Sequence, residues 1–125
     1  MERESIAAME KKVSLSWLLV FYGDMLTENQ REIAHLYWEE DLTLAEIAQQ
    51  FSISRQSVHD TLSRTEKQLE TLEEKMGLLR RFRQVEEGLQ SAQRALSRVN
   101  ATPDTQSYLR EAQLQIAKLM DQEEQ

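Results

Sequence analysis

The sequence "LTLAEIAQQFSISRQSVHDTLSRT", residues 42–65, contains the pattern that decides the fold. Thr43 and Glu46 have the spacing of a capping box, in which two side chains satisfy the first backbone N–H groups of a helix. This predicts a short helix whose apolar residues are Leu44, Ile47, Ala48 and Phe51. Three residues then break the periodicity, and Ser54 is placed to cap a second, longer helix that continues to Gly77.

The turn between these two helices meets the requirements of a helix-turn-helix. The small side chain of Ala48 lets the helices approach closely, and Val58 is expected to pack back on the first helix. We expect Ile53 to fill the corner between them. Ser52 stands where such turns usually have glycine, so a left-handed backbone there costs about 1 kcal/mol.

The rest of the chain has the composition of an all-α protein of about five helices. Only three glycines and one proline occur among 125 residues, whereas a β fold needs a tight turn every few residues. Thr27 and Gln30 repeat the capping-box spacing and predict a helix over about residues 28–39. The helix-turn-helix core, with its N-terminal helix, is therefore expected to span residues 1–76.

A first helix is expected over about residues 3–22. One stripe with helical spacing predicts its buried face: Ile6, Met9, Val13, Trp17 and Val20. Further apolar residues lie on its other faces near Phe21, so this helix is expected to be covered by other helices or by a second subunit. Because a second subunit could cover these residues, we expect the protein to form a homodimer.

Residues 77–125 are expected to form a helical extension that packs on the core or on a second subunit. Its first helix, about residues 78–100, has one apolar stripe that consists of Leu78, Phe82, Val85, Leu89, Ala92 and Val99. Thr102 and Pro103 are placed to begin a second helix, over residues 103–120. Its expected apolar side consists of Tyr108, Ala112, Ile116 and Leu119.

Composition and charge exclude several classes of protein. The chain has no cysteine, so disulfides and thiolate chemistry are excluded, and His35 and His59 lack a neighbour at metal-ligand spacing. We expect no enzyme, no catalytic residue, no metal and no cofactor. The apolar run SLSWLLVFYGDML is too short to span a bilayer and the N-terminus is polar, so the expected location is the cytoplasm.

Two protein families share this pattern. The segment from Leu42 to Leu69 resembles the fourth conserved region of sigma-70-type factors, which reads promoter DNA. The sequences FYGDMLTENQ, LYWEEDLTLAEIA, SRQSVHD and RTEKQLE resemble the YlxM family of small helix-turn-helix proteins from Gram-positive bacteria. This resemblance covers about residues 20–76, and residues 78–125 take no part in it.

The resemblance implies a sigma-region-4-like, all-α fold with a regulatory role. The genes of the YlxM family sit beside those of the signal recognition particle GTPase and its receptor. The resemblance therefore implies a link to protein targeting, with the particle RNA, the GTPase or the receptor as partners.

The second helix of the motif supplies the candidate nucleic-acid-binding residues, because its N-terminal residues face base edges in the usual docking. They are Ser54, Arg55, Gln56, His59, Ser63, Arg64 and Lys67. Arg80, Arg81 and Arg83 form a secondary basic patch.

Three features leave this function open. Asp60 would repel phosphates, Arg55 could instead pair with Glu46, and the formal net charge is −7. One copy is therefore expected to bind weakly, and the alternative function is a protein–protein interaction module that keeps the helix-turn-helix only as a scaffold.

Overall fold

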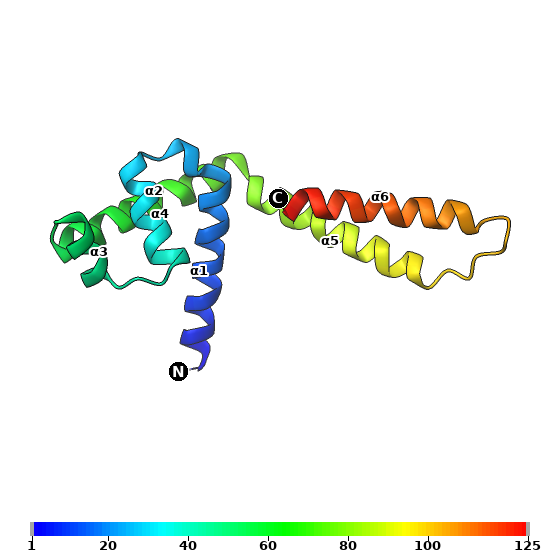
Figure 1. The fold of residues 1–125 in the computed structure, drawn as a ribbon, viewed down its shortest axis with the longest axis horizontal. Helices are drawn as coiled ribbons and strands as arrows, with labels where there is room; N and C mark the ends of the chain where they lie inside the picture. Colours follow the sequence, from blue (N-terminus) through cyan, green and yellow to red (C-terminus); the bar gives the residue numbers. More distant parts are fainter. Residues whose placement is uncertain (1, 125) are drawn as a thin grey trace. The chain divides into compact units, whose positions relative to one another are not determined.

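The computed structural model describes the backbone of residues 2–124 and the side chains of residues 9–121. Within these residues the protein contains helices and no strand, so the all-α prediction is confirmed (Figure 1). The elements are α1 (Glu2–Tyr22), the 3₁₀ turn η1 (Gly23–Met25), α2 (Glu28–Ala34), the π-turn η2 (His35–Glu39), α3 (Leu44–Phe51), α4 (Arg55–Met76), α5 (Leu78–Ser97) and α6 (Gln106–Glu124).

The chain divides into two compact units. The first ends at Leu79 and the second begins at Arg80. Helices α1 to α4 therefore share one unit with the first two residues of α5, while the remainder of α5 and all of α6 form the other.

Helices α3 and α4 form the helix-turn-helix. Ser52 ends α3 in the left-handed region, with φ 56° and ψ 44°, as the sequence predicts. The Ile53 N–H donates to the Ala48 carbonyl oxygen at 3.0 Å, which closes the turn. Ser54 begins α4, because its hydroxyl accepts the Ser57 N–H at 3.0 Å. The turn and the cap are the two features that position the exposed face of α4.

The core of the first unit is built around α4, which contacts α1, α2 and α3. Each of these helices contributes a fully buried side chain: Tyr22, Ile33 and Ile47, packed around Val58, Thr65 and Leu69 of α4. Ala48 and Val58 are buried as expected. The expectation for Ile53 is wrong, because its side chain is 38% exposed and the fully buried residues beside the turn are Ile47 and Val58.

Helix α1 buries a different face from the one that its apolar stripe predicts. Met9, Val13 and Val20 are more than half exposed, at 67%, 55% and 65%. The buried residues are Leu15, Leu18, Leu19 and Tyr22, while Ile6 lies outside the described side chains. This helix is apolar on several faces, and the face that packs is the face that contacts α4 and the π-turn.

No described helix is long and apolar enough to cross a membrane.

Both capping boxes form as the sequence predicts. Thr27 and Gln30 exchange side-chain and backbone hydrogen bonds at the start of α2, and Thr43 and Glu46 do so at the start of α3. Hydrogen bonds from the backbone and the side chain of Thr43 lower the pKa of Glu46.

The helix expected over residues 28–39 continues after Ala34 as the π-turn, in which the Glu40 N–H donates to the His35 carbonyl oxygen at 3.1 Å.

The junction between α4 and α5 is tied to α1 by side-chain hydrogen bonds. Gly77 ends α4 with φ 64°, and the next two N–H groups would otherwise lack partners. The Leu78 N–H donates to the Tyr22 hydroxyl at 3.1 Å, and the Leu79 N–H donates to the Glu73 carboxylate at 3.0 Å. The Tyr22 hydroxyl in turn donates to Glu73 at 2.7 Å, so one network anchors the start of α5.

The second unit has no comparable core. Between Arg80 and Asp121, no described side chain is buried, and the best-covered apolar residues are half-buried. The chain reverses direction between α5 and α6, which we call the α5–α6 hairpin (residues 80–124) (Figure 1).

Two sequence predictions for this unit need correction. Helix α6 begins at Gln106, not at Pro103, after a turn in which the hydroxyls of Thr102 and Thr105 lie 2.9 Å apart. Its half-buried apolar residues are Leu109, Ala112, Ile116, Ala117 and Met120. Tyr108 and Leu119 were expected among them but are 72% and 49% exposed. Of the stripe expected on α5, Leu78, Ala92 and Val99 are exposed as well, and Phe82, Val85 and Leu89 are half-buried. The apolar surface of α6 is therefore wider than the part that is covered.

Candidate nucleic-acid interface

The exposed face of α4 carries the candidate residues. Val58, Leu62 and Leu69 are buried on the side that meets the other helices. Seven residues are exposed: Ser54, Arg55, Gln56, His59, Ser63, Arg64 and Lys67. The structure thus places all of the sequence-derived candidates in this unit on the surface, over the first turns of the second helix of the motif.

Three of these residues, Ser54, Gln56 and His59, already have partners on α4. Ser54 is the N-cap, and its hydroxyl also lies 3.0 Å from the Ser57 hydroxyl. The Gln56 amide donates to Asp60 at 2.9 Å, and His59 Nδ1 lies 3.7 Å from the same carboxylate. Asp60 therefore organises the polar side chains around it, and it places a negative charge in the middle of this face.

Three exposed cations in the N-terminal part of α4 are available to an external anion. Arg55, Arg64 and Lys67 form no ion pair with any side chain that the structure describes. The alternative pairing of Arg55 with Glu46 does not form, and the Glu46 carboxylate instead accepts the Thr43 N–H at 3.1 Å as part of its capping box. Arg64 and Lys67 are three residues apart, and Arg55 lies nine residues before Arg64 at the start of the helix.

One functional candidate on this face was missed by sequence reasoning. A shallow hollow of about 430 Å³ is lined by Lys11 of α1 together with Ser63, Arg64, Glu66, Lys67 and Glu70 of α4. Lys11 Nζ lies 2.7 Å from Glu66, and hydrogen bonding to Glu66 together with its negative charge raises the pKa of Lys11. No local sequence signal could identify Lys11, because it reaches α4 only through the packing of α1.

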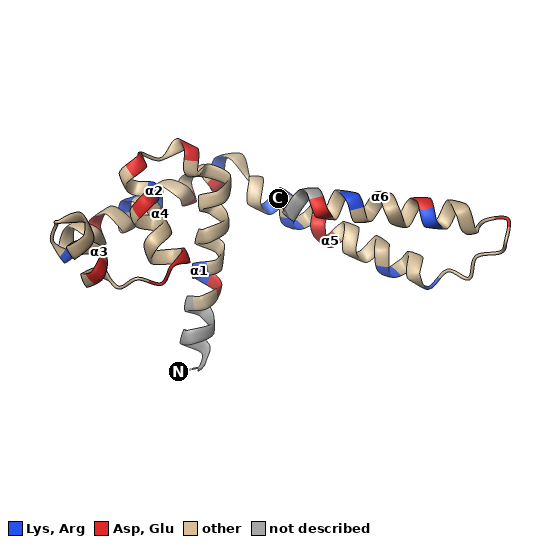
Figure 2. Ribbon diagram, in the orientation of Figure 1, with Lys and Arg blue, Asp and Glu red and all other residues tan. Residues whose placement is uncertain are grey.

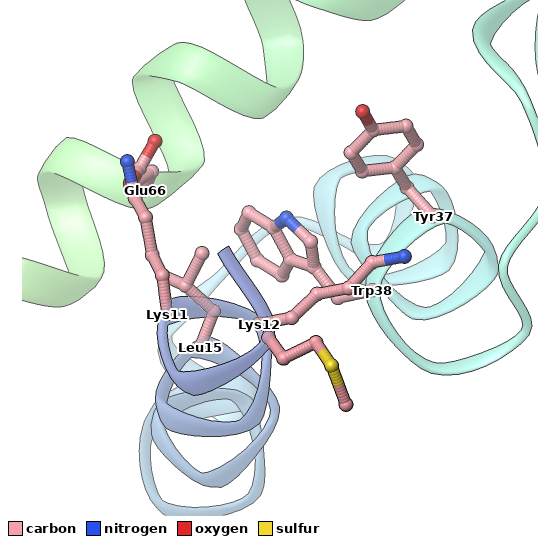
Figure 3. A pocket seen from close by; sticks show the side chains of 7 residues that line it. Lys11, Lys12, Leu15, Tyr37, Trp38 and Glu66 are labelled. Carbon is pink, nitrogen blue, oxygen red and sulfur yellow. The ribbon is translucent and has the colours of Figure 1, made fainter. Parts of the chain in front are cut away.

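A second hollow, of about 550 Å³, lies between α1, the π-turn and α4 (Figure 3). Lys11 points toward Glu66, while Lys12 lies on the side of Tyr37, and Leu15 and Trp38 are between them (Figure 3). Lys12 Nζ is 5.7 Å from the centre of the Tyr37 ring and forms an ion pair with Asp41. Both lysines are thus neutralised by carboxylates, and this hollow has no excess positive charge for an anion.

The secondary basic patch belongs to the other compact unit. Arg80, Arg81 and Arg83 are exposed and lie in the first turns of α5. Figure 2 shows basic residues, in blue, near the start of this helix. No cluster of three or more potential metal ligands occurs among the described residues.

Comparison with known proteins supports the helix-turn-helix. Residues 9–108 match the sequence pattern of the UPF0122 family, described as helix-turn-helix proteins similar to YlxM and p13. The chain belongs to the UPF0122 family. The resemblance to YlxM is therefore confirmed, and the match extends beyond the expected residues 20–76 to include α5 and the beginning of α6.

Members of the UPF0122 family from several bacilli resemble the chain over most of their length. The UPF0122 protein BH2485 of Halalkalibacterium halodurans is 38% identical over 101 residues, which cover 81% of this chain and 93% of the relative. A UPF0122 protein of Bacillus cereus is 34% identical over 113 residues, which cover 90% of this chain and 96% of the relative. A Bacillus anthracis member gives the same identity and coverage.

Proposed function

We propose that this UPF0122 protein is a non-enzymatic regulator that binds duplex DNA through the exposed face of α4. The observation that carries this proposal is the set of three unpaired cations, Arg55, Arg64 and Lys67, on the second helix of a helix-turn-helix. In the usual docking, the first residues of that helix reach base edges and the later cations contact phosphates.

The residues divide by the part of DNA that they fit. Arg55 has the fork of donors that pairs with guanine, and Gln56 has the amide that pairs with adenine. The Gln56 amide donates one hydrogen bond to Asp60 at 2.9 Å, which leaves its second N–H and its carbonyl oxygen for a base. Arg64 and Lys67, one and four residues beyond Ser63, fit the role of phosphate contacts.

The number of cations indicates weak binding by one copy. Proteins that bind DNA usefully make about 6–10 phosphate contacts, whereas this face offers three cations beside Asp60, Glu66 and Glu70. A homodimer doubles the number of cations and provides two half-sites about one helical turn apart.

Binding of duplex DNA to the full chain at several salt concentrations tests this proposal. If Arg64 and Lys67 each contact a phosphate, the logarithm of the binding constant falls against the logarithm of the salt concentration with a slope of about −1.8 per copy. We expect Arg55→Ala to lose about 1–3 kcal/mol of binding and to relax sequence preference, and Lys67→Ala to weaken all sequences alike.

Lys75→Ala is the matched control, because Lys75 is an exposed cation of the same helix near its C-terminal end. Equal losses for Lys75→Ala and Lys67→Ala would show that only net charge matters. No binding at low salt would reject the proposal.

The physiological role proposed here is regulation of the signal recognition particle pathway in the cytoplasm. It rests on the resemblance to YlxM, with the particle RNA, the GTPase or its receptor as partners. Recovery of the protein from cell lysate, with identification of both the nucleic acids and the proteins that accompany it, tests this role. Enrichment of unrelated RNAs and proteins alone would contradict it.

The absence of a buried side chain between Arg80 and Asp121 favours a second candidate function, an interaction module in which the α5–α6 hairpin binds a protein. Salt-dependent DNA binding separates the two functions. If the protein is an interaction module, Arg55→Ala should not weaken binding of its protein partner. If it is a DNA-binding regulator, Arg55→Ala should weaken binding of its DNA target.

A further inference from the structure

We propose that the hollow between Lys11 and the exposed face of α4 binds the sugar–phosphate backbone of one DNA strand, with Lys11 as a phosphate contact beside Arg64 and Lys67. This inference rests on the proposed function, because it requires α4 to dock on duplex DNA. It goes beyond that function by assigning part of the interface to α1, which lies outside the helix-turn-helix.

The hollow has the chemistry of a phosphate site. Its lining contributes the cations Lys11, Arg64 and Lys67 together with the exposed hydroxyl of Ser63. Ammonium, guanidinium and hydroxyl groups all donate hydrogen bonds, and those from cations to phosphate oxygens are among the strongest in proteins. The lining also contains two glutamates, so three positive and two negative charges leave a formal net charge of +1.

The ion pair between Lys11 and Glu66 presents its positive end to solvent. Lys11 Nζ lies 2.7 Å from Glu66 Oε1, yet the side chain of Lys11 is 63% exposed whereas that of Glu66 is 24% exposed. An ammonium group has three N–H donors, so one carboxylate oxygen leaves donors for a phosphate. Glu66 therefore holds Lys11 beside α4, and the more accessible charge of the pair is the positive one.

The hollow lies at the distance from the start of α4 at which a DNA backbone is expected. Gln56, Ser63 and Lys67 follow one another at intervals of seven and four residues, which places them on one side of the helix. Gln56 and Lys67 are 11 residues apart, or about 16 Å along the helix axis. The major groove is about 12 Å wide. When the first turn of α4 enters the groove, the hollow therefore meets the backbone that borders it.

The lining favours a DNA backbone over a free nucleotide. None of the six described residues that line the hollow is aromatic, whereas proteins that hold unpaired bases stack them on aromatic side chains. Tyr37 and Trp38 line the other hollow, and Figure 3 shows Lys11 pointing away from Tyr37, toward Glu66. The hollow thus offers donors for phosphates and no platform for a base.

The salt dependence of duplex DNA binding by the full chain tests the inference. A third phosphate contact changes the expected slope from about −1.8, for Arg64 and Lys67 alone, to about −2.7 per copy. The double variant Lys11→Ala with Glu66→Gln removes the ion pair without changing the net charge. It should return the slope to about −1.8 and weaken binding about tenfold at low salt. If Lys11 only neutralises Glu66, the double variant binds DNA as the wild type does, and the inference is wrong.

The neighbouring ion pair of α1 provides the matched control. Lys12→Ala with Asp41→Asn also removes one pair at constant net charge, on the side of α1 that faces Tyr37. Asparagine tolerates the left-handed backbone of Asp41, whose φ is 58°. This variant should keep the wild-type slope, and circular dichroism verifies that both double variants remain folded. An equal loss of slope in the control would overturn the inference.

Two further outcomes separate the inference from the proposed function. Salt-dependent binding with a wild-type slope of about −1.8, unchanged in Lys11→Ala with Glu66→Gln, would reject the contact by Lys11 and leave DNA binding by α4 intact. Absence of DNA binding at low salt would reject both. Inorganic phosphate and ATP are the probes for a free ligand, and we expect neither to bind at micromolar concentrations. Tight binding of either one that is lost in the double variant would assign the hollow to a free phosphate compound instead.

Discussion

The two units of this chain have similar helical sequences but very different packing. In the first, each of the helices α1 to α4 contributes at least one fully buried side chain to a common core. In the second, two long helices with clear apolar stripes bury no described side chain between Arg80 and Asp121. The comparison teaches that an amphipathic pattern produces a core only where helices meet from several directions.

The largest expected effect comes from Leu69, which is fully buried in α4. Leu69→Ala should lower the free energy of unfolding by about 2–5 kcal/mol, because it leaves a cavity in a packed core. Leu89→Ala in α5 should cost less than about 1 kcal/mol in a monomeric sample, since Leu89 is only half-buried. Urea unfolding followed by circular dichroism measures both, and equal costs would contradict the difference between the units.

The second effect concerns the hydrogen bonds that join the start of α5 to α1. Tyr22→Phe removes the acceptor of the Leu78 N–H and the donor to Glu73, and should cost about 1–3 kcal/mol. Tyr37→Phe is the control, because its hydroxyl forms no hydrogen bond with the residues that the structure describes. Thermal unfolding should rank the variants in this order. The same stability for both would mean that the network contributes nothing.

A smaller effect of opposite sign is expected at Ser52, whose φ of 56° lies in the left-handed region. Ser52→Gly removes backbone strain of about 1–2 kcal/mol but adds freedom to the unfolded chain, which offsets about half of the gain. We expect a stabilisation of up to about 1 kcal/mol in chemical denaturation. Ser52→Ala retains the strain and should give no gain, so stabilisation by alanine would disprove this explanation.

The smallest effect is a pH dependence that distinguishes the two capping boxes. The pKa of Glu46 is lowered in the folded protein by its hydrogen bonds with Thr43, so the ionised form adds stability above the unfolded pKa of about 4.3. This contribution is lost as the pH falls through the folded pKa.

Glu46→Gln makes the second box resemble the neutral Thr27–Gln30 box of α2. The melting temperature of the wild type should exceed that of Glu46→Gln at pH 7, and the difference should shrink toward pH 3. A difference that stays constant with pH would refute the role of the charge.

Local features of the fold could be predicted from the sequence. Both capping boxes and the left-handed Ser52 depend on residues within three or four positions of one another, so their spacing is sufficient. The exposed face of α4 followed from helical periodicity for the same reason. The buried face of α1 did not, because this helix is apolar on several faces and the choice depends on contacts with α4 and the π-turn.

The limits of prediction at the candidate site have the same cause. Lys11 joins the α4 face through a contact with Glu66, 55 positions away in the sequence. The alternative of an Arg55–Glu46 pair could be decided only from the structure, which shows no ion pair between them and a capping-box hydrogen bond at Glu46. Residue type and periodicity identify which side chains are exposed, and tertiary contacts decide which charges remain unpaired.

The hydrogen bonds of Tyr22 and Glu73 have a further consequence for the exchange of backbone amides with solvent. The amides of Leu78 and Leu79 are held by side chains of the first unit, although they begin a helix of the second. Their exchange in heavy water should therefore follow the global opening of the helix-turn-helix core, whereas amides a few turns later in α5 exchange by local fraying. The boundary between the two units would then be visible as a step in protection within one continuous helix.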